Sequence, residues 1–137
     1  MQQALEYRKT EVNTSDNVRI ISLLYDGGIN FIRMARKRLE EGDIAGKGLF
    51  IGKATGVVAE LSSSLNMEAG GEIAGNLRRL YDYILDSLLY ANLKNDPGAF
   101  EEAEKVLDIL RSAWKEMENG KSCAAGTVKN AGMELRI

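Results

Sequence analysis

The chain of 137 residues contains no histidine, one cysteine and one proline. Without histidine it cannot assemble the Ser-His and Cys-His nucleophile pairs of hydrolases or the Glu-x-x-His ligands of di-iron bundles. The single Cys123 cannot form a disulfide within the chain, which is consistent with a reducing compartment. No glycine-rich phosphate loop follows a predicted strand. We therefore expect no enzymatic activity, no catalytic residues, and no cofactor or metal.

Charge and hydropathy argue against two further kinds of partner. The formal net charge of -2 provides no clustered basic face of the kind that nucleic acids require. No apolar run approaches the roughly 20 residues needed to cross a bilayer. The first ten residues are polar and lack the apolar region of a secretory signal. We expect a cytoplasmic protein that neither binds nucleic acid nor inserts into a membrane.

The near absence of alternating apolar residues and the single Pro97 predict an all-α protein. An apolar fraction of 45% is sufficient for a core. Short connections make successive helices antiparallel, which predicts an up-down-up-down four-helix bundle. We expect one domain over residues 1–119, with a short helical cap segment at 1–14, the bundle at 15–119 and a flexible tail at 120–137. The first helix is expected to begin after the capping residues Thr14-Ser15-Asp16 and to stop at Gly42-Asp43. The others are expected from about Ala45 to Asn66, from about Glu72 to Leu93, and from Pro97 to just before Asn119-Gly120.

Each predicted helix has an apolar stripe at helical spacing. We expect the pair Gly70-Gly71 to end the second helix, because glycine is unfavourable within a helix. The expected core positions are Val18, Ile21, Tyr25, Ile32 and Leu39 in the first helix, and Ile51, Ala54, Val58, Leu61 and Leu65 in the second. The third contributes Ile73, Leu77, Leu80, Ile84, Leu88 and Ala91, and the fourth contributes Phe100, Ala103, Leu107, Leu110, Trp114 and Met117.

The first helix has a second apolar stripe beside its core stripe. Two interpretations remain open: a broad core face shared by two neighbouring helices, or a groove that accepts an apolar segment of another chain. The stripe consists of Ile20, Leu24, Gly27 and Phe31, with Met34 after them.

Small residues share one face of the second helix, where Gly48, Gly52 and Gly56 recur every four residues. Each glycine costs about 1 kcal/mol relative to alanine within a helix, so we expect a compensating use. A smooth face lets another backbone approach closely. That backbone could belong to the same bundle, to a second copy or to a client protein.

The tyrosines also suggest a binding surface. A tyrosine buries a large ring but its hydroxyl needs a hydrogen-bond partner, so it is typical of core edges and interfaces. Tyr81 and Tyr83 point roughly 200° apart on a helix, so they cannot both face the core. We expect one of them to be exposed or to cover a groove, and we assign Tyr81 to the candidate binding surface.

An ordered series of short motifs resembles the flagellin-specific export chaperone family, often called FliS. The resemblance covers about Tyr7 to Glu116. Its elements are Tyr7, Val12-Asn13-Thr14-Ser15, Ile21, Leu24-Tyr25-Asp26-Gly27, Lys53-Ala54, Glu60-Leu61, Ser64-Leu65, Gly70 to Leu77, Leu80-Tyr81-Asp82-Tyr83, Leu88, Ala91-Asn92, Arg111 and Ala113-Trp114. The chain departs from the family at Ser15-Asp16-Asn17, where a proline is usual, and at Gly28 and the glycine face.

The resemblance implies a chaperone that binds the disordered C-terminal segment of flagellin, prevents its early polymerisation and helps deliver it to the type III export apparatus. It also implies that the N-terminal segment, with Leu5 and Tyr7, acts as a removable lid. We expect the client to contact Ile20, Leu24, Gly27, Phe31, Tyr81 and the three glycines of the second helix. A self-associating structural or adaptor bundle without a flagellin client is the alternative. The sequence leaves open whether the export gate and flagellar regulators also bind, and whether the chain forms a homodimer.

Overall fold

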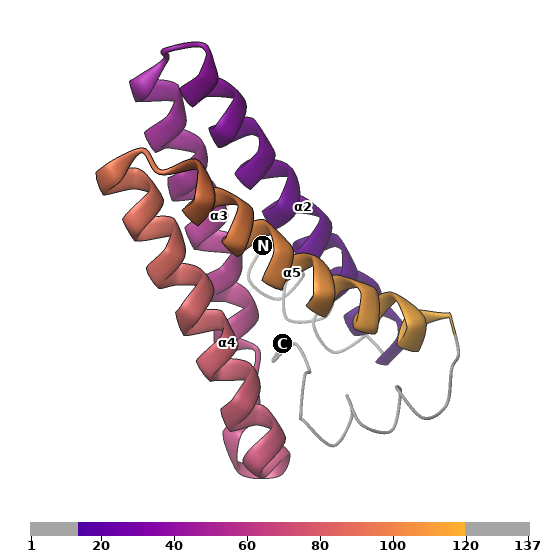
Figure 1. The fold of residues 1–137 in the computed structure, drawn as a ribbon. Helices are drawn as coiled ribbons and strands as arrows, with labels where there is room; N and C mark the ends of the chain where they lie inside the picture. Colours follow the sequence, from indigo (N-terminus) through magenta and orange to yellow (C-terminus); the bar gives the residue numbers. More distant parts are fainter. Residues whose placement is uncertain (1–13, 120–137) are drawn as a thin grey trace, which may run out of the picture.

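The structure, a computed structural model, describes residues 14–119. In this range the chain forms four helices: α2 (Thr14–Glu40), α3 (Ile44–Ser63), α4 (Met67–Lys94) and α5 (Pro97–Glu118). Each helix packs against the next, and α5 also packs against α2, so the four helices enclose a common core (Figure 1). The predicted all-α bundle is confirmed. The predicted cap segment with Leu5 and Tyr7, and the predicted tail, lie outside the described residues apart from Thr14.

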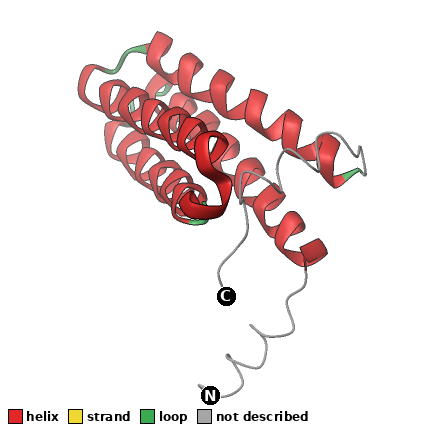
Figure 2. Cartoon of the chain, turned by 90° about the horizontal axis from the view of Figure 1, so that it is seen from below, coloured by secondary structure: helices red, strands yellow, loops and turns green. Residues whose placement is uncertain are grey.

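Short loops connect the helices (Figure 2), and a capping side chain marks the start of the helix that follows each loop. Asp43 accepts a hydrogen bond from the backbone N–H of Gly46, and Asn66 accepts one from Ala69. Asp96 accepts the N–H of Gly98 and precedes Pro97, which occupies the first turn of α5. These caps pair N–H groups that have no partner within the helix.

Two helix boundaries differ from the predictions. Helix α2 begins at Thr14, so the expected capping residues form its first turn. The turn after α3 lies at residues 64–66, and α4 begins at Met67, before the glycine pair. Gly71 instead interrupts α4 from within, at φ 53° and ψ −128°. This backbone conformation is rarely accessible to residues with a Cβ, so the glycine permits a kink and not a loop.

The core follows the predicted stripe of the second helix: four of its positions are buried in α3, and the fifth, Leu65, is buried in the turn that follows. In α4 the prediction is partly wrong: Ile73 and Leu80 are 38% and 39% exposed, whereas Ala74 and Tyr81 are completely buried. Successive residues of a helix point about 100° apart, so Ile73 and Leu80 cannot face the core in the same way as Ala74 and Tyr81. Tyr81 takes the inward position because its hydroxyl meets that of Tyr25 on α2.

The other predicted core positions are buried, apart from five that lie at the edge of the core. The partly buried ones that pack against it are Val18, Leu39, Leu77, Leu110 and Met117. In Figure 1, α5 crosses in front of the bundle toward the start of α2, so α4 and α5 diverge. Among the helices of residues 14–119, none is both long and apolar enough to cross a membrane.

Candidate functional site

The small-residue face of α3 points away from the bundle. Gly52 and Gly56 are exposed, and no atom lies within 4 Å of the position where a Cβ would stand. At Gly48 the nearest atom to that position is Oδ1 of Asn92, at 3.9 Å. No helix in residues 14–119 therefore packs onto Gly52 and Gly56. Of the three partners that the sequence left open, the same bundle is excluded for these described residues, and a second copy or a client remains.

Two exposed leucines of α4 lie close in the chain to the residue that contacts this glycine face. Asn92 lies beside Gly48; Leu89 precedes it on α4 by about one helical turn, and Leu93 follows it. Their side chains are 58% and 68% exposed. We did not identify these two leucines from the sequence. Both are apolar residues outside the core stripe of their helix, which could have marked them. The sequence does not show, however, which other helix lies beside them.

A pocket of about 590 Å³ lies between the end of α3 and α4. Its lining combines apolar side chains with one charge of each sign. The lining residues are Ala59, Ser62, Ser63, Leu65, Met67, Glu68, Arg78 and Leu85.

The second stripe of α2 lies on the opposite side of α3. Ile20 is exposed, whereas Leu24 and Phe31 are half-buried and pack against the edge of the core. Gly27 has open space where a Cβ would stand. Phe31 stacks on Phe50 of α3, with ring centroids 6.3 Å apart. The interpretation as a broad core face therefore holds for Leu24 and Phe31, which pack against the core. The interpretation as a groove for another chain stays a prediction.

Two cations lie over this pair of rings. The ammonium of Lys53 is 5.7 Å from the centroids of both Phe31 and Phe50. The guanidinium of Arg38 is 5.8 Å from the centroid of Phe50. Cations are attracted to the negative face of an aromatic ring, so these contacts hold positive charge beside the apolar stripe.

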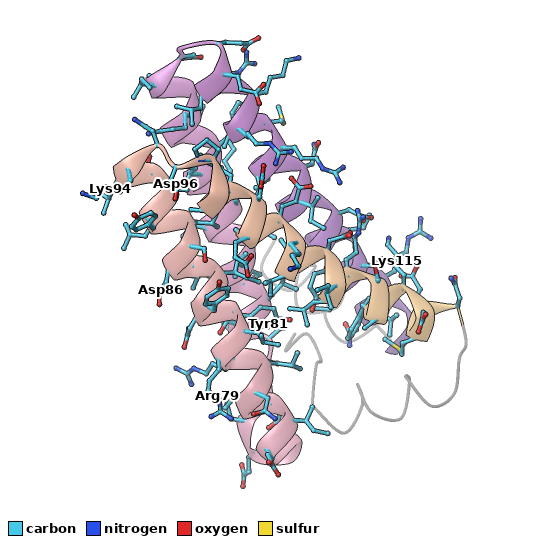
Figure 3. All side chains as sticks on the ribbon, viewed as in Figure 1. Arg79, Tyr81, Asp86, Lys94, Asp96 and Lys115 are labelled. Carbon is cyan, nitrogen blue, oxygen red and sulfur yellow. The ribbon has the colours of Figure 1, made fainter. Side chains whose placement is uncertain are left out.

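The assignment of Tyr81 to the surface is wrong for this conformation, because its side chain is completely buried (Figure 3). The hydroxyls of Tyr25 and Tyr81 are 2.6 Å apart. Burial raises the pKa of Tyr25 to about 12, and it raises the pKa of Tyr81 as well. Tyr83 is the exposed member of the pair, and its hydroxyl donates to Glu102 at 3.0 Å.

Asp26 joins α2 to α5. It accepts hydrogen bonds from Arg111 at 3.5 Å and from Lys115 at 2.9 Å, and Lys115 also donates to Ser22. This arrangement gives Asp26 a structural role between two helices. Within residues 14–119 there is no group of three histidine, cysteine or acidic side chains that could hold a metal ion.

Residues 14–119 thus form an all-α bundle in which α3 has an open face of small residues. Comparison with known sequences identifies the family. Residues 1–121 match the family of the flagellar protein FliS, and the chain belongs to this family. Membership supports a role as a flagellar export chaperone.

Relatives from distant bacteria cover most of the chain. The flagellar secretion chaperone FliSB of Pseudomonas aeruginosa is 39% identical over 106 residues, which are 77% of this chain and 84% of that protein. The flagellar secretion chaperone FliS of Salmonella typhimurium is 43% identical over 100 residues, covering 72% and 74%. That of Bacillus subtilis is 34% identical over 110 residues, covering 80% and 81%.

Proposed function

We propose that this protein is a cytoplasmic flagellar export chaperone that binds the disordered C-terminal segment of flagellin. By holding this segment it prevents early polymerisation and aids delivery to the type III export apparatus. The observation that carries the proposal is the open face of α3, where Gly52 and Gly56 have nothing packed against them although glycine weakens a helix. Membership of the FliS family and the names of its relatives support the choice of client.

The client segment lies across α3 as one or more amphipathic helices. The glycines form its floor, because without a Cβ they allow the closest approach of another helix. Leu89 and Leu93 border the floor on the α4 side. Ile20, Leu24, Gly27 and Phe31 border it on the α2 side, and Gly48 lies toward α4. Tyr81 supports this surface only from within, by holding α4 to α2 through Tyr25.

Coupled folding explains how such a surface can bind firmly and still release its client. A disordered segment that becomes helical buries about 1,000–3,000 Å² and loses several kcal/mol to ordering. The net affinity is then moderate for so large a contact. Release needs no nucleotide, because competition from a partner or removal of the client by transport is sufficient.

The proposal is tested by calorimetric titration with a peptide of the C-terminal ~40 residues of the host's flagellin, a length meant to span one wrapping segment. We expect binding with micromolar or lower Kd, a negative heat-capacity change and a gain of helical circular dichroism. The blocking variant Gly52→Leu should lose most of this binding. The matched control Ser112→Leu places the same side chain on an exposed position of α5 and should bind normally. Absence of binding by the wild type would remove the flagellin assignment.

The N-terminal lid remains a proposal on residues outside the described range. Removing residues 2–10, which include Leu5 and Tyr7, should leave the helical content of the bundle unchanged and alter its affinity for the flagellin peptide. Equal affinity of the shortened and full chains would contradict the lid.

Self-association is the competing use of the same face. A second copy could cover the glycines of α3, as small residues do at close helix crossings. Sedimentation over a concentration series separates the two proposals. A dimer that persists when the peptide is bound, and that Gly52→Leu dissociates, would assign the face to the second copy.

A further inference from the structure

Lys53 occupies the centre of the proposed client surface. It follows Gly52 on α3, and its ammonium lies over Phe31, which belongs to the second stripe of α2. The side chain is exposed, although its charged end is held at 5.7 Å from two ring centroids. One residue therefore bridges the two parts of the surface, the apolar stripe and the glycine floor.

The charge of Lys53 is not neutralised within residues 14–119. No carboxylate in this range lies within ion-pair distance of its ammonium, whereas nearby cations on α2 have partners. Arg38 pairs with Glu41 at 3.1 Å, and both Arg33 and Arg36 pair with Glu104 at 3.2 Å.

The two rings position this charge without cancelling it. Contact with an aromatic face attracts the ammonium and restricts the motion of a long side chain. Because the side chain of Lys53 is already restricted in the free protein, it loses less conformational entropy when a partner binds. An ion pair with this lysine therefore contributes more to the binding free energy. An apolar surface with one fixed, unpaired positive charge at its centre is complementary to an amphipathic helix that carries a carboxylate.

We propose that Lys53 is a specificity-determining residue that binds an aspartate or glutamate side chain of the client helix. This inference rests on the proposed function and adds to it the chemistry of one contact. The carboxylate accepts hydrogen bonds from the ammonium of Lys53, while apolar neighbours on the same client helix contact Phe31 and the glycine floor. The contact fixes the register of the client along α3, which apolar burial alone does not specify.

Neutral variants of Lys53 test the proposal by titration with the same flagellin peptide. Lys53→Met retains most of the aliphatic stem and removes the charge, and Lys53→Gln provides a second neutral variant. At low salt we expect both to bind about three- to tenfold more weakly than the wild type, with a smaller loss of affinity when salt is raised. The control Lys105→Met removes an exposed lysine of α5 that has no described partner, and it should leave the affinity unchanged.

The client carboxylate is then located with peptides in which each acidic residue is replaced singly by its amide. One replacement should weaken binding to the wild type but not to Lys53→Met, because the pair is already broken. Lys53→Glu should recover affinity when that same peptide position carries lysine.

The outcomes separate this inference from the proposed function. If the peptide binds all variants with wild-type affinity and salt dependence, the role of Lys53 is overturned and the chaperone function stands. If Lys53→Met is weakened but no acidic position of the peptide couples to it, the carboxylate contact is overturned. If the wild type does not bind the peptide, both proposals fall. Melting curves that match the wild type establish that the Lys53 variants are folded.

Discussion

At the scale of single residues, the hydrogen-bonded pair of Tyr25 and Tyr81 connects two helices that do not otherwise pack against each other. The pair lies in the centre of the core, where α2 and α4 face each other diagonally. Either single phenylalanine substitution removes this buried hydrogen bond between the two hydroxyls. Each single phenylalanine variant should therefore lower the free energy of unfolding by about 1 kcal/mol. The double variant should cost less than the sum, which urea unfolding of all four proteins will measure.

The same pair predicts a loss of stability at high pH. Burial raises the pKa of Tyr25 from its ordinary value of 10.0 to about 12. The folded state therefore holds this proton more tightly than the unfolded state does. Its contribution to stability is complete below pH 10 and is lost as the pH rises toward 12.

Urea unfolding between pH 8 and pH 11 should show this decrease in the wild type, a range chosen to bracket the ordinary pKa of tyrosine. The decrease should be smaller in the variant with phenylalanine at both positions. Lysine titration affects both proteins alike, so their difference isolates the tyrosines. Parallel curves for the two proteins would contradict the assignment.

At the scale of the helical element, α2 places two consecutive glycines in opposite environments. A Cβ at Gly28 would lie 3.1 Å from Leu107 and 3.2 Å from Val57, whereas at Gly27 it would meet nothing within 4 Å. Gly28→Val should lower the free energy of unfolding by about 1–3 kcal/mol through overpacking. Gly27→Ala should raise it by up to about 1 kcal/mol through helix propensity. Chemical denaturation that gave both variants the same sign would contradict this packing.

The end of α4 depends on a lysine from the neighbouring helix. Lys47 is buried in α3, and its ammonium donates to the carbonyl of Asn92 at 2.9 Å and to the side chain of Asn95. Carbonyls in the last turn lack partners within their own helix. Lys47→Met should therefore lower the free energy of unfolding by about 1–3 kcal/mol. Lys94→Met, an exposed change at the same helix end, should cost under about 0.5 kcal/mol in thermal or urea unfolding.

The elements also show how far the sequence specifies the fold. The stripe of α3 was predictable because its apolar side chains recur at helical spacing, whereas the opposite face carries glycine and other small residues. In α4, apolar side chains occur on several faces, and Ile73 and Ala74 are equally consistent with helical spacing. The choice depends on the position of Tyr25 across the core and on the kink at Gly71. Neither can be read from α4 alone.

At the scale of the whole molecule, the candidate surface combines residues from three helices. Its glycine floor was visible in the sequence, because it repeats within one helix. Leu89 and Leu93 were not, since their place beside that floor depends on how α3 and α4 pair. The same holds for Lys53 and Phe31, which come from different helices and meet only in the folded bundle.

This assembled surface leads to a prediction that separates stability from binding. Replacing Gly52 and Gly56 by alanine fills open space and improves helix propensity, so the free energy of unfolding should rise by about 1–2 kcal/mol in total. If another helix approaches the same face closely, two added methyl groups must hold it further away, and affinity for the flagellin peptide should fall. The variant is then a more stable protein and a weaker chaperone.

The control Gly75→Ala also adds a methyl group in open space, but on α4 and away from the glycine face. It should raise stability to a similar extent per residue while leaving affinity unchanged. Urea unfolding and calorimetric titration of the same samples give both quantities. Equal affinities of the wild type and the double alanine variant would show that no backbone approaches this face of α3, and the client would then have to bind along the stripe of α2.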